Sequence, residues 1–242
     1  MSDSHKREEG FSLIELLIAM SITIVIASLA TNLLAGSLKI RSREDRRSDA
    51  IADVQRALNI MTREIANAGY ALPGGLTAVS SNGIVANDSN SESVRIVSNL
   101  NGKPDAADPS LTDTDVTDAD EDLKFLMYVD NALGQRYIVR YERNAANQTT
   151  VLANRVDSLL IRYYDKKVTY STTFVNGVAD ITNVRNSSDI NESEVSPANA
   201  KYIVISVGVT LPAVGAPGSD DYQPPSYTQL TSDVVLRNAI VY

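Results

Sequence analysis

A single carboxylate, Glu15, lies at the start of the longest apolar stretch of the chain. The 23 residues from 16 to 38 carry no charge, and at ~1.5 Å per residue such a helix covers the ~30 Å hydrocarbon core of a bilayer. A charge at this place is costly, which indicates a function and a partner. If the chain were cut after Gly10, Phe11 would carry a cationic amine on the same helix face as Glu15, four residues away. Alternatively, Glu15 lies among the lipid headgroups and extends toward water without a partner.

Small residues recur at every fourth position of the apolar stretch. Such a row lets helices approach closely in a membrane or in the core of a filament, although any alanine-rich apolar helix shows some row of this kind. A bulky row at residues 14, 18, 22 and 26, all isoleucine, lies beside it. The predicted packing row consists of Ala19, Thr23, Ala27, Thr31 and Ala35.

The segment Gly10-Phe11-Ser12-Leu13-Ile14-Glu15, between a short charged leader and the apolar stretch, resembles the class III signal of type IV prepilins and type II secretion pseudopilins. The resemblance implies cleavage after Gly10 by a prepilin peptidase and N-methylation of Phe11. It also implies that Glu15 helps to match a subunit to its neighbour during assembly. The leader departs from the family pattern, because two glutamates stand directly before the glycine where basic residues are usual.

The charges on either side of the apolar stretch bear on its orientation. Lys6 and Arg7 precede it, whereas five lysines and arginines follow within residues 39–47. Counting these charges alone would place the later part of the chain in the cytoplasm. Because large domains translocate largely regardless of charge, we expect a single-pass inner-membrane protein with a periplasmic head.

A second processing site competes with this interpretation. Ser28, Leu29 and Ala30 place small residues where a general signal peptidase reads, so that the mature protein would begin at Thr31 as a soluble exported binding domain. A carboxylate inside the apolar region and a helical pattern that continues past Ala30 speak against it.

The second half of the helix is predicted from a change of pattern. Mixed charges at 39–49 are typical of a solvated helix surface. Apolar residues then recur in steps of three and four, the pattern of an amphipathic helix with one apolar seam. Gly69, followed by a Pro-Gly-Gly run, is a natural stop, so a single helix from Phe11 to Gly69 would be roughly 88 Å long. The seam consists of Ile51, Val54, Leu58, Met61 and Ile65.

Residues 54–70 are similar to the end of this helix in PilW-like minor pilins and J-type pseudopilins. Weaker similarities to sheet elements of the same subgroup occur at 151–159 with Tyr163, and at 235–238. The resemblance implies a long helix that carries a globular head, in the manner of a lollipop. The predicted organisation is a leader (1–10), a transmembrane and assembly helix (11–38), the amphipathic half of that helix (39–70) and a β-rich head (71–242).

The head is predicted from strand and turn signals. Residues 71–121 are loop-rich, with one strand at 94–98, and further polar loops are expected at 176–200 and after Pro212. Runs of strands behind one helix indicate an α+β fold with an antiparallel sheet. The loops at 76–121 and 175–200 are candidate contact surfaces. Further strands are predicted at 123–129, 137–143, 156–164, 168–174, 201–211 and 228–242, with a hairpin connection at 133–135.

An acidic cluster in the head could hold Ca²⁺ through carboxylate oxygens. The cluster lacks the glycine and the closing glutamate of an EF-hand, and the simpler interpretation is a solvated acidic loop. The calcium hypothesis stays open because some pseudopilins, which the N-terminus resembles, bind calcium; otherwise no cofactor is expected. The cluster comprises Asp113, Asp115, Asp118, Asp120, Glu121 and Asp122.

Composition excludes several classes of function. The net charge is −8, which argues against a nucleic-acid coat because such proteins neutralise phosphates with lysine and arginine. Cysteine is absent, which excludes disulfides, thiolate metal sites and a cysteine nucleophile. The one histidine, His5, lies in the leader, and no catalytic or nucleotide-binding motif is present. We therefore expect a structural protein rather than an enzyme.

Together these patterns predict a minor pilin of a type IV pilus, placed at the tip or in the initiation complex. The alternative is a J-type pseudopilin of a type II secretion system. The expected partners are other pilins or pseudopilins, the prepilin peptidase and the inner membrane, and after assembly the protein would lie in a surface pilus or a periplasmic pseudopilus.

Overall fold

The computed structural model describes residues 12–74, 76–101, 115–146, 148–175, 178–219 and 222–239. Within these ranges the chain forms one long α-helix followed by nine strands and three short 3₁₀ helices, η1 (Ala86–Asp88), η3 (Pro197–Asn199) and η4 (Arg237–Ala239). The chain divides into two compact units, Met1–Arg46 and Arg47–Tyr242. The predicted α+β class with antiparallel strands is confirmed.

Helix α1 spans Leu13–Ala66, 54 residues without a break, because no proline interrupts it and its ends carry suitable signals. After Ala66 the chain turns, and Gly69 adopts φ +77°, the left-handed conformation that ends many helices. The Gly69 N–H donates to the Val97 carbonyl at 2.9 Å, which ties the end of the helix to the head. The helix thus ends three residues before the predicted stop, and Gly69 lies in the turn that follows it.

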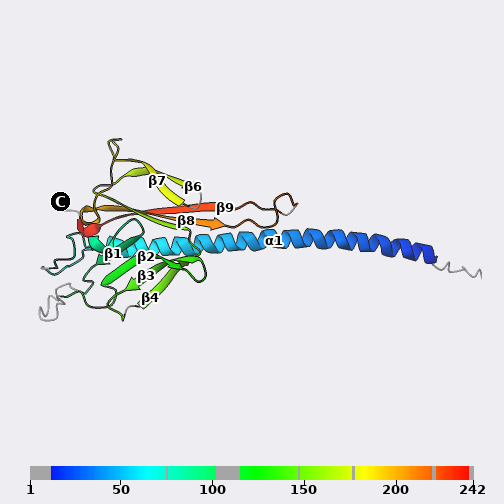
Figure 1. The fold of residues 1–242 in the computed structure, drawn as a ribbon, viewed down its shortest axis with the longest axis horizontal. Coiled ribbons are helices and arrows are strands. Elements are labelled where there is room, and N and C mark those ends of the chain that lie inside the picture. The colour runs from blue at the N-terminus through cyan, green and yellow to red at the C-terminus, as the bar shows by residue number, and fades with distance from the viewer. Residues whose placement is uncertain are drawn as a thin grey trace, which may run out of the picture. The chain divides into compact units, whose positions relative to one another are not determined.

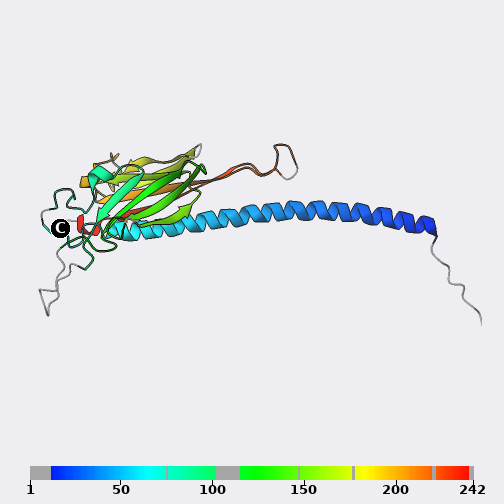
Figure 2. The same cartoon turned by 60° about the horizontal axis from the view of Figure 1, so that its bottom comes forward.

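Sheet A has four antiparallel strands in the order β1-β2-β3-β4 (Figures 1 and 2). Its strands are β1 (Ser93–Val97), β2 (Asp122–Asp130), β3 (Gln135–Glu142) and β4 (Gln148–Asn154). Asp130 pairs with Gln135 across the β2–β3 turn, where Gly134 takes φ +62°. The predicted hairpin connection at 133–135 is confirmed.

Two further sheets complete the head. Sheet B has the order β5-β8-β9, and β6 pairs with β7 as a separate two-stranded sheet. Gly208 in β8 makes room for the Phe174 ring, because a Cβ at this glycine would lie 2.1 Å from Phe174 Cε2. The strands are β5 (Ser158–Tyr164), β6 (Thr169–Val175), β7 (Val178–Arg185), β8 (Tyr202–Leu211) and β9 (Ser226–Val235).

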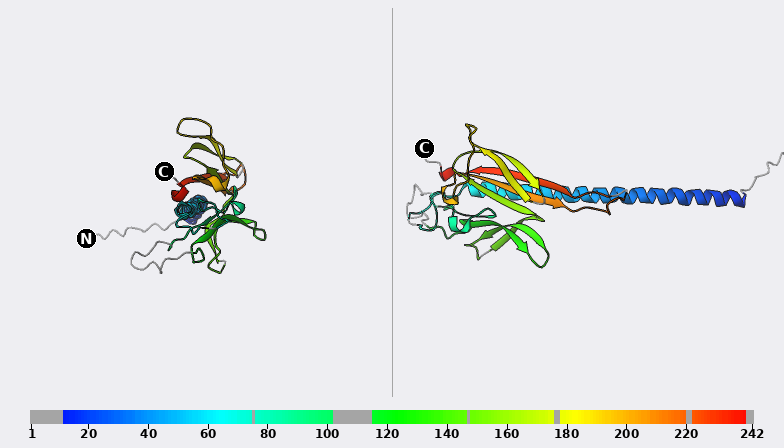
Figure 3. Two further views of the ribbon diagram at one scale, coloured as in Figure 1. Left: turned by 90° about the vertical axis from the view of Figure 1, so that its left-hand side faces the viewer. Right: turned by 45° about the horizontal axis from the view of Figure 1, so that its top comes forward.

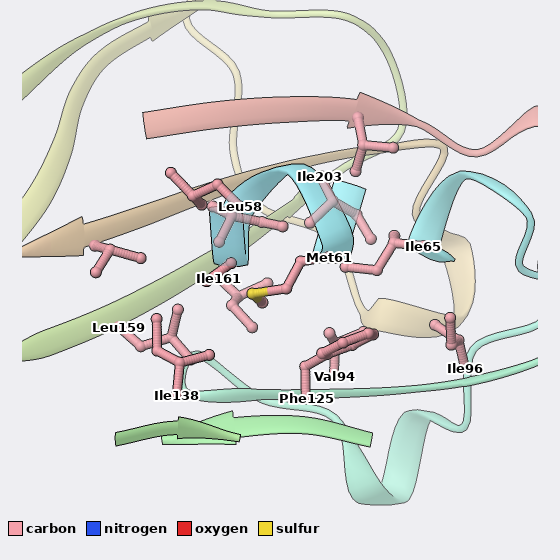
Figure 4. Packing of buried hydrophobic residues seen from close by; sticks show 14 of the residues in the cluster. Leu58, Met61, Ile65, Val94, Ile96, Phe125, Ile138, Leu159, Ile161 and Ile203 are labelled. Atoms are coloured by element: carbon pink, nitrogen blue, oxygen red, sulfur yellow. The ribbon is translucent and has the colours of Figure 1, made fainter. Parts of the chain in front are cut away.

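The core of the head forms around residues 47–66 of α1, which lie between sheet A and sheet B (Figure 3). Leu58, Met61 and Ile65 from the helix contact a layer of strand residues that includes Phe125 from β2 and Ile203 from β8 (Figure 4). The predicted apolar seam is confirmed: Val54, Leu58, Met61 and Ile65 are all buried, and Ile51 is half-buried.

Two strands lie where the sequence predicted other structure. β7 lies inside the segment predicted as a polar loop at 176–200, and β4 was indicated only by the weak similarity to a sheet element at 151–159. Each strand buries only two apolar side chains, Ala179 and Ile181 in β7 and Leu152 and Ala153 in β4. Polar and charged residues fill most of the remaining positions with single valines between them, so the apolar signal was too weak to separate these strands from turns.

The main chains of Gly69 and Gly83 are in close contact between the end of α1 and β1. Gly83 has φ +81°, and a Cβ on it would lie 1.8 Å from the main-chain nitrogen of Gly69. The Gly83 carbonyl accepts from the Val97 N–H at 2.8 Å. The end of the helix, the Gly83 turn and β1 therefore share one tight junction of main-chain atoms.

Candidate assembly segment and acidic loop

Glu15 occupies the third position of α1 and closes its first turn. Its Oε2 accepts a hydrogen bond from the main-chain N–H of Ser12 at 3.0 Å, and the Ser12 carbonyl accepts from the Leu16 N–H at 3.1 Å. This is the glutamate half of a capping box, which satisfies one of the free N–H groups at a helix start. Glu15 thus has a partner that the sequence did not indicate. Gly10 and Phe11, the predicted processing residues, lie outside the described residues.

The row of small residues is exposed along its whole length, and its hydroxyls are satisfied within the helix. Thr23 Oγ1 donates to the Ala19 carbonyl and Thr31 Oγ1 to the Ala27 carbonyl, both at 2.8 Å. Each threonine therefore bonds back to the preceding member of the row and leaves no hydroxyl proton unpaired. A face of this kind can enter hydrocarbon or a helix interface without a desolvation penalty. Ala35 completes the exposed row.

The large apolar side chains of this segment are also exposed, from Leu13 at 77% to Ile40 at 52%. Among the described residues, α1 is the one helix that is long and apolar enough to cross a membrane, judged by length and composition. So much exposed apolar surface requires lipid or other helices to cover it.

The acidic cluster of the head is divided among different partners. Asp115 accepts from the N–H and hydroxyl of Thr117, and Asp118 accepts from the side-chain amide of Asn101 at 2.7 Å. Glu121 is buried and accepts from the Leu100 and Asp118 N–H groups at 3.0 and 3.1 Å.

The remaining carboxylates of the cluster bind arginine. Asp120 pairs with Arg140, and Asp122 pairs with Arg95 at 2.7 Å. Across the described part of the chain, no three acidic or histidine side chains converge as metal ligands, and Asp113 lies outside it. The carboxylates of this loop bind the protein's own donors, and the calcium hypothesis gains no geometric support.

Arg140 on β3 is the centre of the ion-pair network that holds this loop. Its guanidinium contacts Glu64 of α1 at 3.0 Å, Glu142 of β3 at 2.9 Å and Asp120 of the loop. Burial alone would lower the pKa of Arg140, but its hydrogen bonds to Glu64 and Glu142 raise that pKa above its ordinary value. Sequence reasoning missed this cluster. The available signal was that Arg140 and Glu142 alternate along β3 with Ile138, and therefore share the face on which Ile138 is buried in the core.

Arg95 on β1 forms a second network with Asp88 at 2.5 Å and Asp122. The hydrogen bond from Arg95 holds the pKa of Asp88 below its ordinary value. The two arginines therefore tie η1 and the end of the acidic loop to the strands of sheet A.

The predicted contact loops are wrong in part. Residues 82–85 and 93–99 are largely buried rather than free for recognition, and Asn82 donates to the Pro197 and Ala200 carbonyls at 2.9 Å each. This amide joins the two predicted loops to each other in the core. Among the described residues of these loops, 187–194 stay largely exposed.

Comparison with known proteins gives one match, which falls on the N-terminal segment. Residues 5–31 match the family model of the prokaryotic N-terminal methylation motif. No curated protein and no solved structure matches the chain significantly. The chain thus carries the class III signal of the type IV pilin and pseudopilin family, as the sequence predicted. Pilins and pseudopilins are structural proteins, and the signal and the apolar helix together support anchoring in a membrane.

Proposed function

We propose that this protein is a structural minor pilin, stored in the inner membrane with its head in the periplasm. It is cut between Gly10 and Phe11 by a prepilin peptidase, N-methylated on Phe11 and assembled through its N-terminal helix into a type IV pilus. We place it at the tip or in the initiation complex.

The observation that carries this proposal is the continuity of one helix through two environments. α1 begins at the methylation motif, presents mainly exposed apolar and small residues from Leu16 to about residue 38, and then supplies the buried seam of the head. One continuous helix therefore carries both the apolar segment and the buried seam of the head. The satisfied hydroxyls of Thr23 and Thr31 suit both the lipid-embedded and the packed state.

The capping geometry suggests how Glu15 serves assembly. Its carboxylate accepts a main-chain N–H at the very start of the helix, where a mature chain would also carry its new N-terminal amine. The same acceptor would then receive the amine of a neighbouring copy at the cost of a local hydrogen bond. Capping needs only an oxygen acceptor at residue 15, whereas binding the amine of a neighbouring copy also needs the negative charge of the carboxylate.

The first test is the intact mass and N-terminal residue of the protein extracted from membranes. A chain that begins with N-methylated Phe11 is the expected result. A Thr31 start would overturn the proposal in favour of a soluble exported domain. An uncut chain would indicate a plain membrane anchor and would also contradict it.

Substitution of Glu15 separates capping from assembly. Glu15→Gln keeps an oxygen that can cap Ser12 but removes the charge, so we expect normal cleavage and loss of the protein from sheared pili. Ser21→Ala is the matched control, because it removes a hydroxyl of the same helix that bonds only to Leu17. Incorporation of the Gln variant at the normal level would contradict the assembly role.

The J-type pseudopilin is the second candidate, because the methylation motif is common to both systems. Deletion of the gene distinguishes them. Loss of surface pili with normal protein secretion is expected, whereas loss of secretion with normal pili would assign the protein to a pseudopilus.

A further inference from the structure

A cavity of about 970 Å³ opens in the head where sheet A, sheet B and the β6–β7 hairpin meet. Its wall includes Ser91 and Glu92 before β1, Met127 of β2, Arg136 of β3 and Asp157 directly before β5. Neither the N-terminal helix nor the acidic loop lines it. The volume lies at the upper end of the range for ligand pockets, ~300–1,000 Å³, and is therefore large enough for a short segment of another chain.

The Asp157 carboxylate is the unusual group in this wall. Its Oδ2 is buried and has no hydrogen-bond partner, which costs free energy because a charged oxygen has lost its water. The nearby cation does not relieve it: Arg136 Nη1 donates to the main-chain carbonyl of Asp157 at 2.5 Å. Among the described residues, the Asp157 side chain therefore lines the cavity without an ion-pair partner.

The surrounding residues keep this carboxylate in place. The Asp157 N–H donates to the Gly208 carbonyl at 2.8 Å, and Ser158 Oγ accepts from the Ala179 N–H at 3.1 Å. The Ile161 N–H donates to the Ser91 carbonyl at 2.8 Å. The wall therefore has main-chain ties to β8, β7 and the segment before β1, so the pocket is formed before any ligand arrives.

Charge and apolar surface together define what would fit. The wall carries two carboxylates, Glu92 and Asp157, and one guanidinium, Arg136, so its net charge is −1. At the rim, Val129, Val178 and Tyr227 expose 42, 61 and 52% of their surface. A small inorganic cation would leave this rim uncovered, whereas a basic side chain between apolar neighbours would satisfy both features.

We propose that this cavity receives an arginine or lysine side chain, flanked by apolar residues, from a partner protein. The cationic group donates to the Asp157 carboxylate, its aliphatic stem lies against Met127, and the flanking residues cover the rim. The proposal concerns the head alone and stands whether or not the protein is a pilin.

The test uses the full chain in an uncharged maltoside detergent, labelled with ¹³C at its methionine methyl groups. Met127 reports on the cavity, while Met61 in the core and Met20 in the apolar segment report on the fold and on detergent effects. The probes are acetyl-Val-Arg-Val-amide, the same peptide with neutral citrulline for arginine, and acetyl-Gly-Arg-Gly-amide.

We expect the arginine peptide to shift the Met127 signal saturably and to leave Met61 and Met20 unchanged. Loss of a hydrogen bond to a charged group weakens binding by about tenfold or more, so the citrulline peptide and the Asp157→Asn variant should each show at least that loss. Asp165→Asn is the matched control, because Asp165 is a half-exposed aspartate at the opposite end of β5, and it should bind as the unaltered protein does.

Three results would overturn the proposal: no shift of Met127, an equal shift with citrulline, or undiminished binding by folded Asp157→Asn. If Asp157→Asn loses the Met61 signal of the folded core, the variant is unfolded and cannot test binding. The comparison of the arginine and citrulline peptides on the unaltered protein then decides whether the charge is recognised. The glycine-flanked peptide tests the rim and should bind severalfold more weakly. Equal affinity would show a site for a free guanidinium ligand and would refute the partner protein.

Discussion

The junction between Gly69 and Gly83 offers a sharp test of how α1 is fastened to the head. In Gly83→Ala the new Cβ would lie 1.8 Å from Gly69 N and 2.5 Å from the Ala68 carbonyl carbon, where ordinary contacts begin at 3.4 Å. The obstructing atoms are all main chain, so the helix end or the turn must move by more than 1 Å. Such a shift breaks the hydrogen bonds between Gly69 and Val97 and between Val97 and Gly83.

The expected loss follows from three contributions. Alanine in the left-handed region costs about 1–2 kcal/mol, and each buried main-chain group left without a partner costs about 1–3 kcal/mol. The sum for Gly83→Ala is about 3–8 kcal/mol. Gly134→Ala is the matched control, because Gly134 has φ +62° with no atom within 4 Å of its would-be Cβ, so only the backbone term of about 1–2 kcal/mol applies.

The measurement is thermal unfolding of the full chain in detergent, followed by near-ultraviolet circular dichroism of the head's tyrosines. At about 2–4 °C per kcal/mol for a domain of this size, the control should lose about 2–8 °C. Gly83→Ala should lose at least about twice as much as the control or fail to fold. If both variants melt within error of each other, the close approach of the two glycines does not contribute to stability and the reasoning is wrong.

Other contacts yield predictions of the same kind. Arg140→Met leaves three carboxylates without their common cation and should cost about 3 kcal/mol or more in urea unfolding, whereas half-exposed Arg143→Met should cost under about 1 kcal/mol; equal losses would contradict the network's importance. Met61→Ala should cost about 2–5 kcal/mol because it opens a cavity in the core, and Met20→Ala should leave the melting of the head unchanged. Burial raises the pKa of Tyr164 to about 12, so the folded state favours the neutral phenol; this contribution to stability is complete below about pH 10 and declines as pH rises toward 12. The measurement is absorbance at the phenolate band during alkaline titration. Between pH 10 and 12 the unaltered protein and Tyr164→Phe should show nearly the same number of ionised tyrosines, because Tyr164 is still neutral there. One additional ionised tyrosine in the unaltered protein would show that Tyr164 titrates near its ordinary pKa and would contradict its burial.

The helix was predictable because its signals are local. The apolar seam repeats with the helical period, the uncharged stretch from 16 to 38 has no break, and Gly69 follows the last apolar turn. Strands rich in isoleucine and valine, such as β8, were also clear in the sequence. β4 and β7 were not, because a hairpin strand with two buried residues owes its structure to pairing with its neighbour rather than to its own composition.

The acidic loop shows a different limit. In the sequence its carboxylates form one equivalent set, typical of a cation site or a solvated loop. In the structure Asp120 and Asp122 pair with arginines of β3 and β1, and Glu121 is buried on main-chain N–H groups. Apart from the Asp118 N–H, these partners lie 20 or more residues away, so no spacing rule within the loop could identify them.

The sequence by itself therefore determined the N-terminal signal, the long helix and the α+β class, since each depends on residue types at short, regular separations. Only the tertiary structure decided which charges are paired, how the strands divide into three sheets, and that the Asp157 Oδ2 atom is buried without a donor. The physical reason is that ion pairs, sheet order and desolvation depend on which distant segments meet when the core closes. That meeting is set by the packing of the whole head around residues 47–66.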